Sequence, residues 1–165
     1  MHVLVLEIKN LLKNLDAWLD KAVDHATGKK FDANTLLEAR LAPDMLPLLR
    51  QIQLACDHAK WCAARTAGKE APSHADTEKT IADCKQRIAT VITYLGTFTA
   101  HDFEKTDTTT VTHPRWEGKT MTGTHYLVET GLPNFYFHLT TAYALLRHNG
   151  VEIGKRDYVG QVTWK

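Results

Sequence analysis

Apolar residues recur at intervals of three and four along four stretches of the chain, with charged and polar residues between them. In a helix this spacing brings the apolar side chains onto one face, which can pack against neighbouring helices. The pattern therefore predicts four long helices, over residues 4–27, 44–67, 81–99 and 125–149. Gly28, Gly68 and Gly150 follow three of these stretches, at the position where glycine commonly ends a helix.

The segment over residues 107–122 departs from this periodicity. It is rich in threonine, with valine and tryptophan, and these residue types favour strands. Glu117 and Gly118 can form the turn, so the segment predicts a small β-hairpin before the last helix. A short helical turn is also predicted after Asp32, whose carboxylate can accept hydrogen bonds from the first backbone amides.

Pro133 lies inside the last predicted helix. Proline has no backbone N–H group and clashes with the preceding turn, so we expect it to kink or split this helix. Asn134 would then open the second segment and cap its exposed backbone donors, a structural role that needs no metal. The tail over residues 151–165 lacks helical periodicity, and we expect it to form a strap across the bundle or between subunits.

Four amphipathic helices with short connections predict an all-α fold, an antiparallel four-helix bundle with a small β-hairpin before the last helix. The 165 residues fit a single domain over 1–165, long enough to bury a core without disulfides or structural metal. The charge balance of 20 Lys and Arg against 19 Asp and Glu provides no field for nucleic acid or an anionic membrane surface. No apolar run approaches the ~20 residues of a membrane span.

The three cysteines, Cys56, Cys62 and Cys84, form no CxxC pair and are odd in number. They indicate neither a disulfide framework nor a zinc knuckle, and they suit a reducing, cytoplasmic compartment. Cys56 and Cys62 lie on the apolar face of the second helix, where burial should raise the pKa of each thiol. The sequence contains no GxGxxG motif, phosphate-binding loop or Ser/His/Asp motif, so nucleotide chemistry has no support.

The run LPNFYFHLTTAYALLRHNGVEIGKRDYVG, from Leu132 to Gly160, resembles the signature of a family of unknown function within the DinB/YfiT-like superfamily of small four-helix bundles. The resemblance extends to EARLAPDMLPLLRQIQLACDHAK, from Glu38 to Lys60. It implies the bundle fold, a frequent homodimer and a site at one end of the bundle. Superfamily members look like metalloenzymes, and some are thiol-dependent transferases.

In those relatives a histidine from the second helix and an HxxxH pair from the last helix hold a divalent metal. Carried over through the resemblance, the second histidine of the pair is His138, the first falls on Asn134, and the second-helix ligand falls on Gln53. Two of three imidazoles are thus replaced by amides, whose neutral oxygens are weak ligands for transition metals. The resemblance therefore implies no required cofactor, and it leaves a weak divalent metal at His138 open.

The spacing of polar residues along the second and last helices points to the same positions. Gln53 and Asp57 are four residues apart beside the apolar stripe of the second helix, and Asn134 and His138 are four apart on the last. If the two faces meet, they form a polar pocket in which Asp57 orients His138 as a general base, while Gln53, Asn134 and Tyr143 bind a small molecule. The alternative is a satisfied hydrogen-bond network that fixes helix register and does no chemistry.

Two functions stay open at this point. One is a degenerate transferase acting on a small thiol or electrophile, with metal or with His138 as base. The other is a metal-free dimeric binding or stress-associated module without catalysis. His58 and His125 could replace the missing imidazoles, although we expect both at the surface or its boundary. A homodimer is expected because the chain is rich in aromatic residues that one bundle would leave uncovered, namely Trp18, Trp61, Phe135 and Tyr136.

Overall fold

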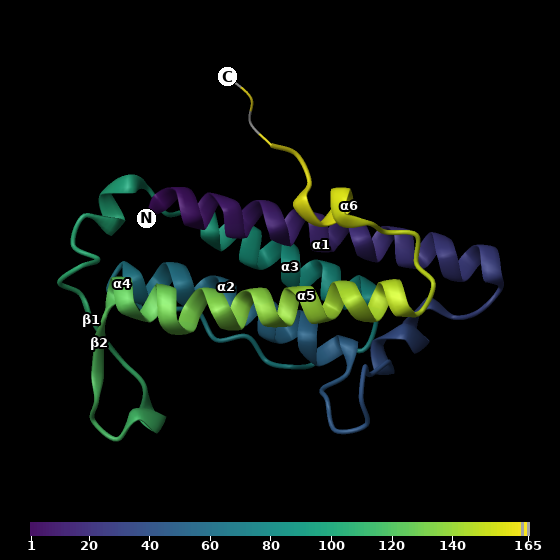
Figure 1. The fold of residues 1–165 in the computed structure, drawn as a ribbon, viewed down its shortest axis with the longest axis horizontal. Coiled ribbons are helices and arrows are strands. Elements are labelled where there is room, and N and C mark those ends of the chain that lie inside the picture. Colours follow the sequence, from purple (N-terminus) through teal and green to yellow (C-terminus); the bar gives the residue numbers. More distant parts are fainter. Residues whose placement is uncertain (163, 165) are drawn as a thin grey trace.

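Four long helices pack side by side in the computed structural model, which describes residues 1–162 and 164 (Figure 1). They are α1 (His2–Lys29), α2 (Leu48–Thr66), α3 (Ile81–Leu95) and α5 (Leu132–His148). A two-stranded antiparallel hairpin, β1 (Thr110–Thr112) and β2 (Thr120–Thr122), precedes the short helix α4 (Gly123–Tyr126), and α6 (Lys155–Val159) follows α5. Short 3₁₀ turns lie at Ala33–Glu38, Ala100–Phe103 and Pro114–Trp116. The predicted helical bundle with a hairpin before the last helix is confirmed.

The helices run in two directions. His2 reaches the carbonyl of Phe98 while Lys85 pairs with Asp16, so α1 and α3 are antiparallel. Gln51 contacts His138 and Arg65 contacts Tyr126, so α2 and α5 are antiparallel as well. Because α2 and α3 themselves run the same way, residues 67–80 return along the length of the bundle between them (Figure 1). This crossover replaces the short connection that the sequence suggested.

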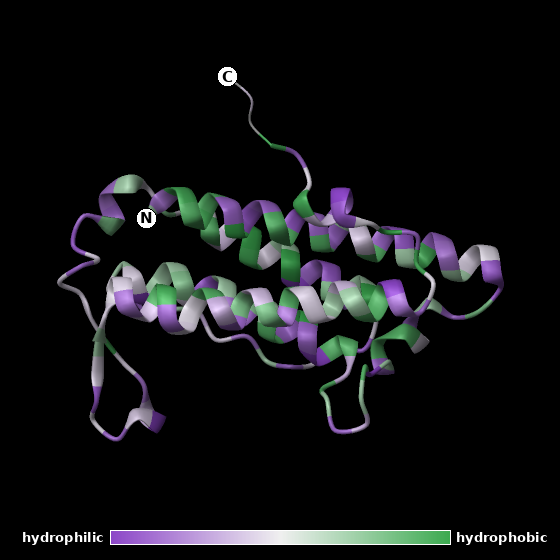
Figure 2. Ribbon diagram, viewed as in Figure 1, coloured by the Kyte–Doolittle hydropathy of each residue, from purple (hydrophilic) through white to green (hydrophobic). Residues whose placement is uncertain are grey.

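The apolar stripes of the four helices form one continuous core. Figure 2 shows apolar and polar residues alternating along each long helix, as an amphipathic pattern requires. Trp18 and Phe135 are buried within the chain, so the expectation that they would lie on an uncovered face is wrong. Trp61 and Tyr136 are half-buried. No helix in the part of the chain that the structure describes is long and apolar enough to cross a membrane.

Local chemistry explains where the elements begin and turn. The Asp32 carboxylate accepts from the backbone N–H of Asn34, as predicted. Thr80 and Asp83 form a reciprocal capping box at the start of α3. Glu117 and Gly118 both have positive φ, 53° and 82°, which is the conformation that a tight hairpin turn requires.

The helix continues through Pro133 instead of breaking. Residues Leu127–Gly131 form a π-helical turn between α4 and α5, in which the N–H of Leu132 bonds to the carbonyl of Leu127. The Asn134 side chain donates to the Thr130 carbonyl at 2.6 Å. The predicted cap is therefore wrong. Asn134 was expected to accept from free backbone N–H groups at a helix start, but in the π-helical turn its side chain donates to a backbone carbonyl instead.

The tail crosses the bundle. Gly150, with φ of 91°, turns the chain after α5, and α6 then lies on α1. The Trp18 indole N–H donates to the Asp157 carbonyl at 3.1 Å, and the Tyr158 ring stacks on Trp18. The strap predicted from the tail is confirmed as far as Tyr158, whose carbonyl accepts from the Asn14 side chain at 3.0 Å, and the chain leaves the bundle after α6 (Figure 1). Thr163 and Lys165 lie outside the described residues.

Candidate functional site

His138 lies buried where α5 packs against α2, a contact that we call the α2–α5 seam. Its Nδ1 is 2.8 Å from Oε1 of Gln51. The amide nitrogen of Gln51 donates to the Leu46 carbonyl at 3.0 Å, so Oε1 is turned toward the imidazole. Because that oxygen can only accept, His138 carries its proton on Nδ1 and keeps the lone pair of Nε2.

His58 stacks on His138, with ring centroids 5.4 Å apart. Burial, followed by the neighbouring imidazole of His138, lowers the pKa of His58 to about 4. Burial and the charge of Arg50 also lower the pKa of His138. The Nδ1 atom of His58 is buried and has no hydrogen-bond partner among the described residues. The seam thus holds two stacked imidazoles that are neutral at physiological pH.

Gln53 and Asp57 do not join this pair, so the predicted pocket is wrong. The Gln53 amide donates to Glu78 at 2.7 Å and accepts from Arg50. Asp57 pairs with Lys60 at 2.8 Å and with Arg87 at 2.9 Å. The cause is the crossover of residues 67–80, which brings Glu78 against α2 and turns both side chains away from α5. Asp57 therefore cannot orient His138 as proposed.

The other predicted site residues are also dispersed. Asn134 is committed to the Thr130 carbonyl. Tyr143 packs edge-on against Trp18 and Tyr158, beside α1 and the strap. The predicted set of His138, Asp57, Gln53, Asn134 and Tyr143 is thus divided among four environments. His125, one of the two replacement imidazoles, is exposed near Thr122.

Two seam residues were undervalued by the sequence argument. Gln51 is absent from the predicted site, and His58, predicted at the surface or its boundary, is half-buried and stacks on His138. They are seven residues apart in α2, which is two helical turns, so they share one face. This spacing, read together with His138, was the available signal.

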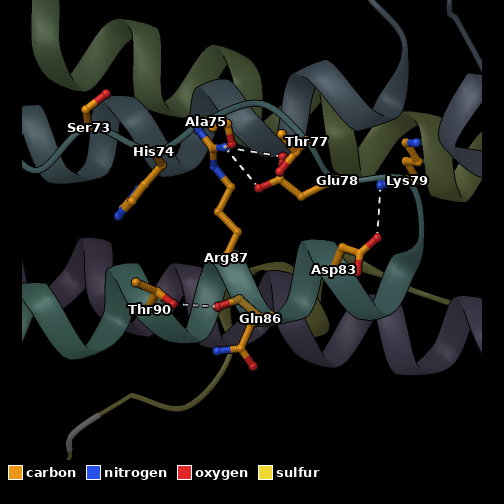
Figure 3. Close-up of a pocket in the computed structure, with 10 residues that line it drawn as sticks. All are labelled: Ser73, His74, Ala75, Thr77, Glu78, Lys79, Asp83, Gln86, Arg87 and Thr90. Carbon is orange, nitrogen blue, oxygen red and sulfur yellow. Dashed lines mark hydrogen bonds and ion pairs between the residues drawn. The ribbon is translucent and has the colours of Figure 1, made fainter.

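A buried charged cluster lies where α2, α3 and the crossover meet. Arg87 reaches from α3 toward the crossover (Figure 3), where it bonds to the Ala75 carbonyl at 3.2 Å and to Glu78 at 3.0 Å. Its side chain is 2% exposed, and it also pairs with Asp57 and Asp76. Burial alone would raise the pKa of Glu78, but the bond from Gln53 and the charge of Arg87 lower it overall. A cleft of about 490 Å³ opens beside this cluster.

The donors do not fit the metal that the resemblance implies. Of the three matched positions only His138 has an imidazole, and Gln53 and Asn134 are engaged elsewhere. Within the described residues, no group of three or more His, Cys, Asp or Glu side chains could hold an ion. Burial raises the pKa of Cys56 and Cys62 to about 12, as the sequence predicted, so neither thiol is activated.

Comparison with known sequences now decides the family. Residues 1–159 match the family described as a domain of unknown function, DUF1993. The chain belongs to the DUF1993 family. No curated protein matches the sequence.

The DUF1993 chain is also similar to a crystal structure of a DinB family member protein from Shewanella denitrificans. The two share 49% sequence identity, with 98% of this chain and 92% of that chain covered, and a TM-score of 0.94. The DinB-like family of unknown function indicated by the two sequence runs is confirmed. The DUF1993 fold is therefore DinB-like.

Proposed function

We propose that this DUF1993 protein is a metal-independent, homodimeric binding module and not a degenerate transferase. The hydrogen bond that His138 donates to Gln51 carries the proposal, because it commits the one matched imidazole to a seam that Gln53 and Asn134, the other two matched positions, do not enter. Gln53 and Asn134 would have to abandon Glu78 and Thr130 before they could approach a shared ion. Their neutral amide oxygens would gain little in exchange.

The partner proposed for the module is a small molecule. The folded chain carries surface clefts of about 430 to 610 Å³, within the range of small-molecule sites, and their linings mix aromatic and polar side chains. Nucleic acid is disfavoured by the near balance of 20 basic and 19 acidic residues. A cytoplasmic location is supported by three buried cysteines that form no disulfide.

A second copy of the chain is the other proposed partner. Val128 and Phe137, which precede and lie within α5, are more than half exposed at 59% and 56%. Val3 and Leu6 near the start of α1 are exposed as well. Apolar side chains of this size on a bundle surface support association.

Metal content and oligomeric state test this function. Protein purified without chelator or histidine tag should contain far less than one transition metal per chain by elemental mass spectrometry. His138→Ala should leave that content unchanged, and it should cost about 1–3 kcal/mol of stability because Gln51 loses its buried donor. Stoichiometric metal that is lost in His138→Ala would overturn metal independence, and sedimentation of a monomer at micromolar concentration would overturn the dimer.

A further inference from the structure

Arg65 differs from the other partly or fully buried cations of α2 and α3. Arg87, Lys60 and Arg50 each have a carboxylate within ion-pair distance. Arg65, near the end of α2, is half-buried and has no such partner in the described part of the chain. A guanidinium that is partly removed from water and lacks an anion is a candidate for binding one.

Aromatic residues hold Arg65 in place. Its guanidinium carbon is 4.9 Å from the ring centroid of Trp61 and 5.3 Å from that of Tyr126. Its Nη1 donates to the Tyr126 hydroxyl at 3.2 Å. Stacking of this kind leaves the in-plane N–H groups of arginine available at the edge of the fork. Arg65 is therefore fixed in orientation and has donors to spare.

The charge of Arg65 is not neutralised locally. Burial raises the pKa of Tyr126 to about 12, so the hydroxyl that accepts from Arg65 stays neutral. Burial lowers the pKa of His113 on the hairpin, and the positive charges of Arg65 and Arg115 add to this effect. The positive charge of Arg65 thus acts as far as the hairpin, and the Tyr126 hydroxyl does not neutralise it.

A cleft of about 430 Å³ opens beside Arg65, between the end of α2 and β1. Trp61 and Arg65 line one side, and β1 lines the other. β1 pairs with β2 along one edge only, and the hydroxyls of Thr110 and Thr112 have no hydrogen-bond partner among the residues that the structure describes. Lys69 at the same cleft is paired with Asp102, and Glu70 is the single acidic lining residue.

We propose that this cleft binds the carboxylate of a small aromatic acid. The planar carboxylate matches the free edge of the Arg65 fork, and the exposed Thr110 and Thr112 of β1 line the same cleft. The ring of the acid would lie against Trp61, which supplies apolar surface in a cleft large enough for it. This inference deepens the proposed binding role by naming the ligand class and its site.

Benzoate is the probe, titrated by calorimetry at low ionic strength with EDTA present. Wild-type protein should bind benzoate, and Arg65→Gln should weaken binding ~10–100-fold, the range for hydrogen bonds to a charged group. Arg65→Lys keeps the charge and loses the fork, so it should fall between the two. The matched control is Arg115→Gln, which removes the same charge from the hairpin but lines a different cleft, and it should change affinity less than about twofold.

Benzamide, the neutral analogue, should bind at least about tenfold more weakly than benzoate. No binding of benzoate by folded wild-type protein at ~10 mM would overturn the proposal. So would equal affinity in wild type and Arg65→Gln, or inorganic phosphate binding as tightly as benzoate. Because EDTA is present throughout, these results are independent of metal content. Stoichiometric metal in purified protein would contradict the proposed function while leaving the cleft assignment to its own test.

Discussion

The buried polar residues of α2 are neutral where it packs against α5 and charged where it packs against α3. We call the α2–α5 seam, with Gln51 and His138, the neutral seam, and the α2–α3 contact, with Asp57 and Arg87, the charged seam. Toward α5, helix α2 presents Gln51 and His58, which meet His138 and remain uncharged. Toward α3 it presents Asp57, which forms ion pairs with Arg87 and with Lys60. One helix thus carries a neutral polar face and a charged face, and both include side chains that are almost fully buried.

The difference follows from chain connectivity. The α2–α5 seam joins antiparallel helices, and apolar packing can hold their register unaided. On the α3 side, residues 67–80 must return along the bundle, and this extended segment has little regular structure of its own. Arg87 anchors the segment at Ala75, Asp76 and Glu78. Buried charge is used where a loop needs a fixed position, in keeping with a role of ion pairs in structural specificity.

Breaking the charged seam should have the largest effect. Arg87→Leu would leave Asp57 and Glu78 without their shared cation, and we expect a loss of about 3–5 kcal/mol in the free energy of unfolding by urea. Lys85→Met is the matched control, two residues earlier on α3. Its pairs with Asp16 and Asp20 are more exposed, so it should cost less than about 1 kcal/mol. Equal losses in the two variants would contradict the contrast.

The neutral seam should instead be sensitive to volume. A Cβ on Gly131 would lie 2.8 Å from Sγ of Cys62, so Gly131→Ala should destabilise by about 1–3 kcal/mol through overpacking. Combining it with Cys62→Ala should recover part of that loss. A double-mutant cycle in urea measures the coupling, and strictly additive effects would show that the close approach is unimportant.

The neutral seam should also respond to acid. The pKa of His58 is lowered to about 4 in the folded chain against about 6.5 unfolded, so the unfolded state binds more protons between these values. This contribution to stability is complete above pH 6.5 and is lost as the pH falls toward 4, by up to about 3 kcal/mol. His58→Phe should flatten the dependence in that window. His101→Gln, on an exposed ring, should retain the wild-type slope.

The smallest expected effect is a change in metal affinity, and it distinguishes position 134 from position 53. Asn134→His would place two imidazoles four residues apart on α5, and zinc or nickel affinity should rise at least about tenfold over wild type. Gln53→His should add little, because Gln53 faces Glu78 and Arg50 in the charged seam. Competition with a metal-binding dye measures both. A larger gain from Gln53→His would show that position 53 faces His138 after all.

Periodicity was sufficient to predict the helices, the hairpin and the burial of the cysteines, because each depends on local spacing. The direction of α3 has no local signal, since an amphipathic stripe is the same in either orientation. That missing direction explains the error at Gln53 and Asp57: their partners Glu78 and Arg87 approach only because the chain crosses over. His138 was placed correctly in the interior, while its partner Gln51 lay two residues from the position chosen.

The π-helical turn at Leu127–Gly131 acts geometrically as one extra residue within an otherwise continuous helix. One residue turns an α-helix by about 100°. Tyr126 and the hairpin before this turn are therefore set at a different angle from α5 than an uninterrupted α-helix would give them. Deleting a single residue there would rotate Tyr126 away from Arg65 while leaving Phe135 and Leu139 in the core. The angle between the hairpin and the bundle thus depends on the number of residues between Tyr126 and Leu132.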